Sequence, residues 1–104
     1  MRQFDVLDNP IPRARPAVPF VTVLQSDLAD TGRDRVVAPL ALRAAMPTLA
    51  GRLIPVVKVA EEDYALLVPS LTALPVTDLR HVVASLADDR EGILAALDYL
   101  FIGL

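Results

Sequence analysis

The sequence predicts an α+β fold that is mainly β, in which a small barrel or curled sheet is followed by one helix at the C-terminal end. Two observations support this prediction. Short apolar segments rich in β-branched residues recur between residues 3 and 86, separated by proline-rich or polar turns. From residue 88 onward the apolar residues instead recur at the three- and four-residue spacing of an amphipathic helix.

The first quarter of the chain is predicted to hold two strands separated by a long loop. Residues 3–7 alternate in polarity, with Phe4 and Val6 on one face, as in a half-buried strand. Residues 8–19 contain four prolines, which exclude a helix or a central strand and favour an extended loop or a sheet edge. The β-branched residues that follow predict a second strand over residues 20–25.

The next stretch is predicted to turn, extend and turn again. Residues 26–34 are rich in Ser, Asp, Thr and Gly, the residues of a wide turn. Residues 35–40 resume an extended segment. Residues 40–46 are mostly Ala, Leu, Arg and Met, which favour a short helical turn that Pro47 would end or restart.

A hairpin is predicted in the middle of the chain. Residues 52–60 form an apolar, β-branched run, and residues 61–71 follow it after an acidic turn at Glu61 to Asp63. Pro55 indicates that the first of these strands lies at an edge or a bulge. Residues 81–86 predict one more strand. Its alternation places three residues on one face: His81, Val83 and Ser85.

The last element is predicted to be an amphipathic helix that begins near Asp89. Asp88 with Glu91 three residues later resembles a capping box, and Gly103 is the expected stop because glycine adopts a left-handed cap conformation at little cost. About fourteen residues would give a rod of roughly 20 Å. The apolar stripe consists of Ile93, Leu94, Leu97, Leu100, Phe101 and Leu104.

Composition limits the function classes. Hydrophobic residues make up 54% of the 104 residues and mean hydropathy is +0.46, so we expect part of the surface to close an oligomer interface. The net charge of −3 disfavours direct binding to nucleic acid. Neither a linker nor a repeat is apparent, so we expect one domain over residues 1–104. Without a secretion signal or an apolar run of membrane-spanning length, we expect a cytoplasmic protein that does not bind membranes.

No pattern typical of an enzyme is present, so we predict a protein that acts by binding, without a cofactor. The chain has no cysteine and one histidine, which excludes a thiolate or multi-histidine metal site. We interpret the acidic clusters at Glu61 to Asp63 and at Asp88 and Asp89 as solvated turn and cap residues. His81 is interpreted as an ordinary histidine. Arg13 and Arg15 are interpreted as solubilising residues, with anion binding by Arg15 as the alternative.

Several motifs, taken in order, resemble the CcdB family of toxins over almost the whole chain. The most specific are Gln25-Ser26-Asp27, Asp30-Thr31-Gly32, Pro39-Leu40 and Pro55-Val56-Val57. The last is the terminal pattern of Phe101 followed by Gly103. The resemblance implies an SH3-like barrel or curled antiparallel sheet with a long C-terminal helix, and a symmetric homodimer.

The resemblance also implies a function. Members of this family are toxins of type II toxin–antitoxin modules that bind the A subunit of DNA gyrase and trap the enzyme on cleaved DNA. A cognate CcdA-like antitoxin neutralises them, and the two repress their own operon together, with the antitoxin supplying the DNA contact. The antitoxin-binding residues remain unassigned.

The resemblance assigns gyrase binding to the chain end. Phe101 and Gly103 match the family tip, Leu104 replaces another branched aliphatic residue, and Ile102 stands where the family has tryptophan. Isoleucine lacks a π face, and loss of such an anchor commonly costs about 2 kcal/mol of binding free energy. Two further contacts are implied at positions that also differ from the family: Leu28, followed by Ala29, and Asp98.

Two alternatives stay open. The related MazF-type fold carries endoribonucleases, and Arg15-Pro16 and Thr31 loosely resemble two positions of that pattern. The other alternative is a homologue that binds its antitoxin but no longer poisons gyrase.

Overall fold

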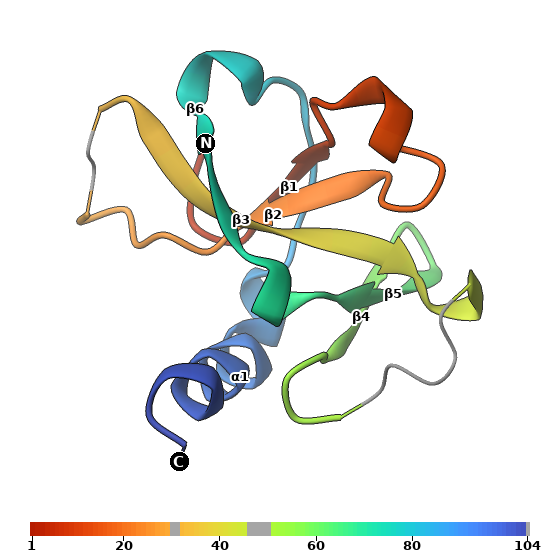
Figure 1. The fold of residues 1–104 in the computed structure, drawn as a ribbon, viewed down its shortest axis with the longest axis vertical. Helices are drawn as coiled ribbons and strands as arrows, with labels where there is room; N and C mark the ends of the chain where they lie inside the picture. The colour runs from red at the N-terminus through yellow and green to blue at the C-terminus, as the bar shows by residue number, and fades with distance from the viewer. Residues whose placement is uncertain (30–31, 46–50, 104) are drawn as a thin grey trace.

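The fold is α+β and mainly β, as predicted: a curled antiparallel half-barrel with an α-helix packed against it (Figure 1). The computed structural model describes residues 1–29, 32–45 and 51–103. The helix is α1 (Arg90–Phe101). The strands are β1 (Asp5–Asp8), β2 (Phe20–Val23), β3 (Asp34–Leu42), β4 (Val56–Val59), β5 (Glu62–Leu66), β6 (Thr72–Pro75) and β7 (Val82–Ser85).

The strands lie in the order β4, β5, β3, β2, β1, β7, and β6 pairs with β3 outside this path. β3 is the centre of the sheet because its nine residues are long enough to pair with three neighbouring strands. One side pairs with β2, as in Leu40 opposite Phe20. The other side pairs with β5 near its end and with β6 near its start, as in Leu40 opposite Leu66 and Val37 opposite Thr72.

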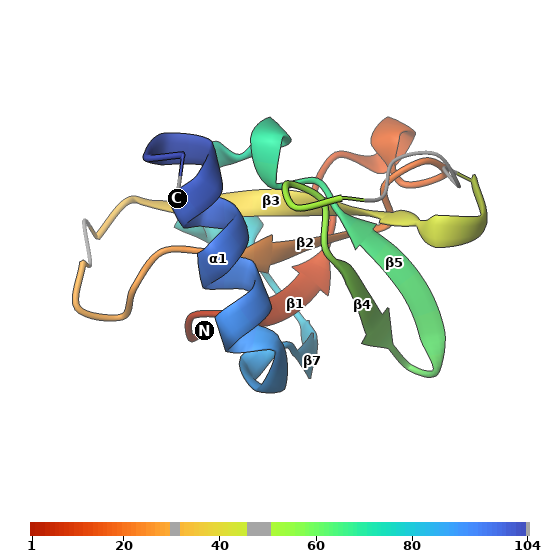
Figure 2. The ribbon, with the colours of Figure 1, turned by 90° about the horizontal axis from the view of Figure 1, so that it is seen from below.

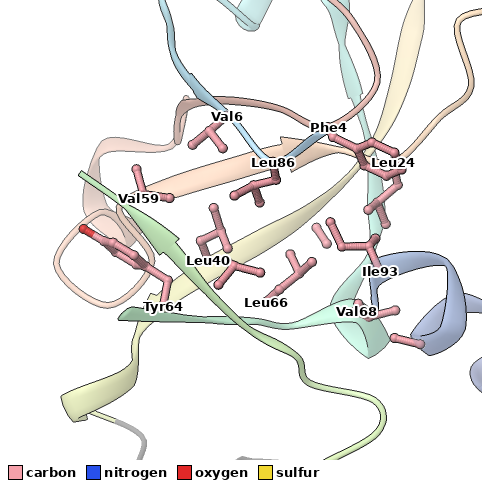
Figure 3. Close-up of a cluster of buried hydrophobic side chains, with 13 residues drawn as sticks. Phe4, Val6, Leu24, Leu40, Val59, Tyr64, Leu66, Val68, Leu86 and Ile93 are labelled. Carbon is pink, nitrogen blue, oxygen red and sulfur yellow. The ribbon is translucent and has the colours of Figure 1, made fainter. Parts of the chain in front are cut away.

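The main core fills the space between the sheet and α1 (Figure 3). Ile93 and Ala96 of α1 are buried against strand residues such as Leu40 and Leu66. Phe20 packs edge-to-face on Tyr64, with ring centroids 5.5 Å apart, and burial raises the pKa of the Tyr64 phenol. The buried members are Phe4, Val6, Leu24, Ala38, Leu40, Val57, Val59, Tyr64, Leu66, Val68, Leu86, Ile93 and Ala96.

A second, smaller apolar cluster is separate from the main core, and Leu74 of β6 packs against it. Its buried members are Leu7, Val21, Val23, Val37 and Leu79. The first strands are therefore buried on both faces: Val6 lies in the main core and its neighbour Leu7 in the second cluster. This explains why polarity alternation over residues 3–7 identified Phe4 and Val6 as inward residues but did not reveal the role of Leu7.

Two predictions in the first half need correction. Residues 8–19 do contain a helical turn, the 3₁₀ turn η1 (Pro12–Ala14), because proline is tolerated at the start of such a turn. The helical turn predicted over residues 40–46 is wrong at its start: β3 continues to Leu42, and only the 3₁₀ turn η2 (Arg43–Ala45) follows. Pro47 lies outside the described residues.

The hairpin prediction is confirmed, with a shift in the turn. β4 and β5 pair in regular register from Val56 opposite Ala65 to Val59 opposite Glu62. The turn is therefore Ala60 and Glu61, one residue earlier than the acidic cluster suggested, and both have positive φ, 51° and 71°. β5 is followed by the 3₁₀ turn η3 (Val68–Ser70). Pro55 precedes β4, which is an edge strand as predicted.

β6 and the 3₁₀ turn η4 (Val76–Asp78) were not anticipated, because residues 72–78 show no clear alternation. β7 confirms the predicted last strand. The prediction that His81, Val83 and Ser85 share one face of this strand is wrong. Val6 pairs with Ala84 and Leu7 with Val82, so that Val83 is the extra residue of a β-bulge.

The C-terminal helix is confirmed, but its start is built differently. The 3₁₀ turn η5 (Ala87–Asp89) precedes α1, and the Ala87 N–H donates to the Ser85 Oγ at 3.2 Å. The N-cap residue Asp89 makes no side-chain cap hydrogen bond, so the predicted capping box is absent. Across the described ranges, no helix is long and apolar enough to cross a membrane.

Candidate target-binding end of the C-terminal helix

The C-terminal end of α1 is held firmly while its last apolar side chains stay exposed. Leu94, Leu97 and Leu100 are partly buried against the main core. Beyond them Phe101 and Ile102 are 69% and 66% exposed. Phe101 therefore does not belong to the inward stripe that helical spacing predicted, and the buried Ala96 takes part in it instead.

Glycine ends the helix, as predicted. Gly103 has φ +80°, and its N–H donates to the main-chain carbonyls of Asp98 and Tyr99 at 3.1 Å each. The Ile102 N–H also donates to the Asp98 carbonyl, at 2.8 Å. These bonds fix the direction of the chain at Ile102, so two apolar side chains project from an ordered turn. Leu104 lies outside the described residues.

Asp98 is an exposed helix residue one turn before the tip. Residues three and four positions apart are neighbours on a helix surface, so its carboxylate lies on the side of α1 that also carries Phe101 and Ile102. This arrangement places a negative charge beside the apolar surface, where it can select a partner that carries a cation.

An arginine far away in sequence supports the same end of the helix. The Arg52 guanidinium lies 3.9 Å from the centroid of the Tyr99 ring. This contact joins the segment before β4 to the last turn of α1. Tyr99 is absent from the predicted apolar stripe. Arg52 was missed in the sequence, because no local pattern links residues 47 positions apart.

Leu28 is presented by the loop between β2 and β3 and is 98% exposed. Three preceding side chains hold this loop. The Gln25 side chain donates to the Ala29 carbonyl and accepts from the Val36 N–H. Ser26 Oγ accepts from the Leu28 N–H at 3.1 Å. The Asp27 carboxylate accepts from the Gln3 N–H at 2.8 Å. The Gln25-Ser26-Asp27 motif thus shapes the loop between β2 and β3 that exposes Leu28 (Figure 1).

In Figure 1 this loop lies at the left edge of the molecule and the C-terminal end of α1 lies at the bottom, so the two are separate parts of the surface. Leu28 belongs to the loop between β2 and β3, so it lies apart from the tip formed by Phe101 and Ile102. A target that touches both must span the distance between them.

The residues of the nuclease alternative are placed only in part, because Thr31 lies outside the described residues. Arg15 Nε donates to the Asn9 carbonyl at 2.7 Å, so this arginine has a structural contact. It also lines an open pocket of about 350 Å³ with Asp8, Pro10, Asp78, Arg80 and His81. His81 is exposed and has φ +50°. Among the described residues, no group of His, Cys, Asp or Glu is arranged to hold a metal ion.

A comparison with models of protein families matches residues 3–103 to the family described as CcdB protein. The match covers the seven strands and the helix of the residues that the structure describes. The same region contains the motifs that suggested the resemblance in the sequence. The chain therefore belongs to the CcdB family.

Proposed function

We propose that residues 1–104 form one toxin domain that acts as a homodimer, binds the A subunit of DNA gyrase and traps the complex of gyrase with cleaved DNA. Family membership supports the general role of a toxin in a toxin–antitoxin module. The observation that supports the binding mode is the exposure of Phe101 and Ile102 on an ordered helix end. Large apolar side chains exposed in this way commonly mark an interaction site.

The chemistry of the tip favours binding over catalysis. Phe101 and Ile102 supply apolar area to be buried, while Asp98 supplies a charge that can pair with a basic residue of the target. Leu28 is proposed as a separate contact at the side, and Leu104 as the last residue of the tip. Arg52 is proposed to act indirectly, because its stacking on Tyr99 keeps the helix end in place.

A cognate CcdA-like antitoxin is proposed as the second partner, with which the toxin represses its own operon. The net charge of −3 agrees with a complex in which the antitoxin makes the DNA contacts. The experiment is expression of the chain, with and without this antitoxin, in a bacterium that has sensitive gyrase. We expect growth arrest with gyrase-linked DNA cleavage, both suppressed by the antitoxin.

Control variants separate the alternatives in this assay. Phe101→Ser should abolish toxicity, whereas Val83→Ser, at an exposed apolar position on β7, should leave it unchanged. Antitoxin binding with neither arrest nor cleavage would identify a homologue that no longer poisons gyrase. Growth arrest with cleaved RNA and intact DNA would instead support the nuclease alternative.

A further inference from the structure

The two edges of the half-barrel are not equivalent. β4 and β7 lie at the ends of the strand order. β7 carries the bulge at Val83, and bulges interrupt pairing and protect an edge from added strands. β4 instead pairs with β5 in regular register over its whole length. β4 is therefore the edge at which another strand can add.

The hairpin geometry shows which main-chain groups of β4 face outward. A two-residue turn makes Val59 and Glu62 a hydrogen-bonded pair, and such pairs alternate along antiparallel strands. The next hydrogen-bonded pair is Val57 with Tyr64, and the Leu66 N–H donates to the Pro55 carbonyl at 2.9 Å, as the alternation requires. The N–H and C=O groups of Val56 and Lys58 consequently point away from β5, toward the outer edge.

A groove of about 470 Å³ lies beside this edge. Pro55, Val56 and Val57 line one side, and residues 87–93, at the start of α1, line the other. Figure 2 shows the start of α1 beside β7, with β4 across the open side of the sheet. Val57 and Ile93 belong to the main core, so the groove has an apolar floor.

The rim of the groove is acidic and its carboxylates are unpaired. Within the ranges that the structure describes, Asp88, Asp89 and Glu91 form neither a hydrogen bond nor an ion pair through their side chains. Arg90, the cation among the described lining residues, donates from Nη1 to Gln3 Oε1 at 3.2 Å, and three carboxylates against this one cation leave the rim negative. These carboxylates favour the N-terminal end of α1, and none of the three residues is buried, so they can also bind an external cation.

The basic residue of β4 is already neutralised. Lys58 Nζ lies 2.8 Å from Asp63 Oδ1, and this hydrogen bond and ion pair raise the pKa of Lys58. The edge therefore offers outward main-chain groups, an apolar floor and a net negative rim.

We propose that β4 and this groove bind an extended, basic segment of a partner protein. The segment adds as a strand to the outward groups of Val56 and Lys58 and sets lysine or arginine side chains against Asp88, Asp89 and Glu91. Charge complementarity selects this occupant. In a second copy of the chain, the lysine of β4 is already paired with Asp63 and the rim is again acidic. Repulsion between like charges would therefore oppose pairing of β4 with the β4 of another copy.

The groove and the gyrase-binding tip proposed above lie at opposite ends of α1. The twelve residues of the helix span about 18 Å. A partner in the groove therefore leaves Phe101 and Ile102 uncovered. The inference does not depend on gyrase as the target.

The test uses the full chain and a fluorescein-labelled synthetic peptide of about eight alternating valine and lysine residues. Fluorescence anisotropy should show binding that weakens when salt is raised to about 0.5 M. The same peptide with glutamate in place of lysine should bind at least about tenfold more weakly. Equal binding of the two peptides, or no binding of the lysine peptide at millimolar concentration, would overturn the proposal.

Variants locate the site. Asp88→Asn with Glu91→Gln should weaken binding of the lysine peptide by about three- to tenfold. The matched control removes two exposed carboxylates from the Arg15 pocket, Asp8→Asn with Asp78→Asn, and should change little. An equal loss in both double variants would show a non-specific effect of charge and would contradict a defined groove.

Amide exchange measured by NMR tests strand addition directly. In the protein alone, the Val56 and Lys58 amides should exchange fast, while the Val57 and Val59 amides should be protected by β5. Addition of the lysine peptide should slow exchange at Val56 and Lys58 only. Peptide binding without this protection would overturn strand addition. Protection that appears on raising the protein concentration without peptide would show a second copy as the occupant and overturn the choice of partner.

Discussion

At the scale of single residues, Ile102→Trp should strengthen the proposed gyrase contact. Ile102 is 66% exposed at the ordered tip, so a larger ring fits there without disturbing the core. Tryptophan adds apolar area and a π face that can stack on a guanidinium, and we expect about tenfold tighter binding to the gyrase A subunit. Calorimetric titration measures this. Val83→Trp adds the same ring at an exposed position on β7 and should bring no gain; an equal gain would argue against the tip as the gyrase contact.

The positions of such residues were easier to predict from the sequence than their contacts. Gly103 was recognised as a helix stop because glycine tolerates positive φ, and it has φ +80°. Gln25, Ser26 and Asp27 were visible as a motif, but their hydrogen bonds depend on main-chain groups brought close by the fold. Arg52 on Tyr99 gave no sequence signal at all, because the contact forms between distant segments.

Two glycine substitutions in and after α1 should have opposite effects on stability. Gly103→Ala places a side chain at positive φ and should lower the free energy of unfolding by about 1 kcal/mol. Gly92→Ala lies inside the helix, where an added Cβ meets no atom within 4 Å, and should raise it by about 0.5 to 1 kcal/mol. Urea unfolding measures both. A loss with Gly92→Ala would contradict the helical position and open surroundings of that residue.

At the scale of elements, the strands and the helix were predictable where a hydrophobic period was clear. The hairpin of β4 and β5 and the helix α1 followed from such periods. Residues 40–42 were assigned to a helical turn because their residue types favour one. In the fold, Leu40, Ala41 and Leu42 instead pair with β5 and complete β3, so tertiary pairing outweighs propensity. β6 was missed because its pairing with β3 has no counterpart in local sequence.

The hairpin turn is a place where stability can be gained. Ala60 and Glu61 both have positive φ, although neither is a residue type that favours it. Asparagine followed by glycine suits a two-residue turn of this kind. Ala60→Asn combined with Glu61→Gly should therefore raise the free energy of unfolding by about 1 kcal/mol or more. Thermal unfolding checks this, with Glu62→Gly in β5 as a control that should be destabilising. A destabilised double variant would contradict the turn geometry.

At the scale of the whole molecule, the sequence contains more apolar residues than the core of one chain buries. Hydrophobic residues make up 54% of the sequence, and among the described residues Leu28, Phe101 and Ile102 leave well over half of their surface exposed. These side chains stay unburied in the single chain. They are also the proposed contacts with gyrase, so a dimer must keep at least the tip accessible.

We expect a homodimer in solution, because association would cover part of this apolar surface. Sedimentation equilibrium should give a mass twice the 11.2 kDa of the chain at micromolar concentration. Since dimerisation is coupled to folding by mass action, the unfolding temperature should also rise with protein concentration. Leu28→Asp adds a charge to an exposed loop residue without disturbing the core, so loss of the dimer in this variant would place Leu28 at the dimer interface. A mass of 11.2 kDa at high micromolar concentration, with an unfolding temperature independent of concentration, would refute the dimer and leave the exposed apolar side chains to other partners.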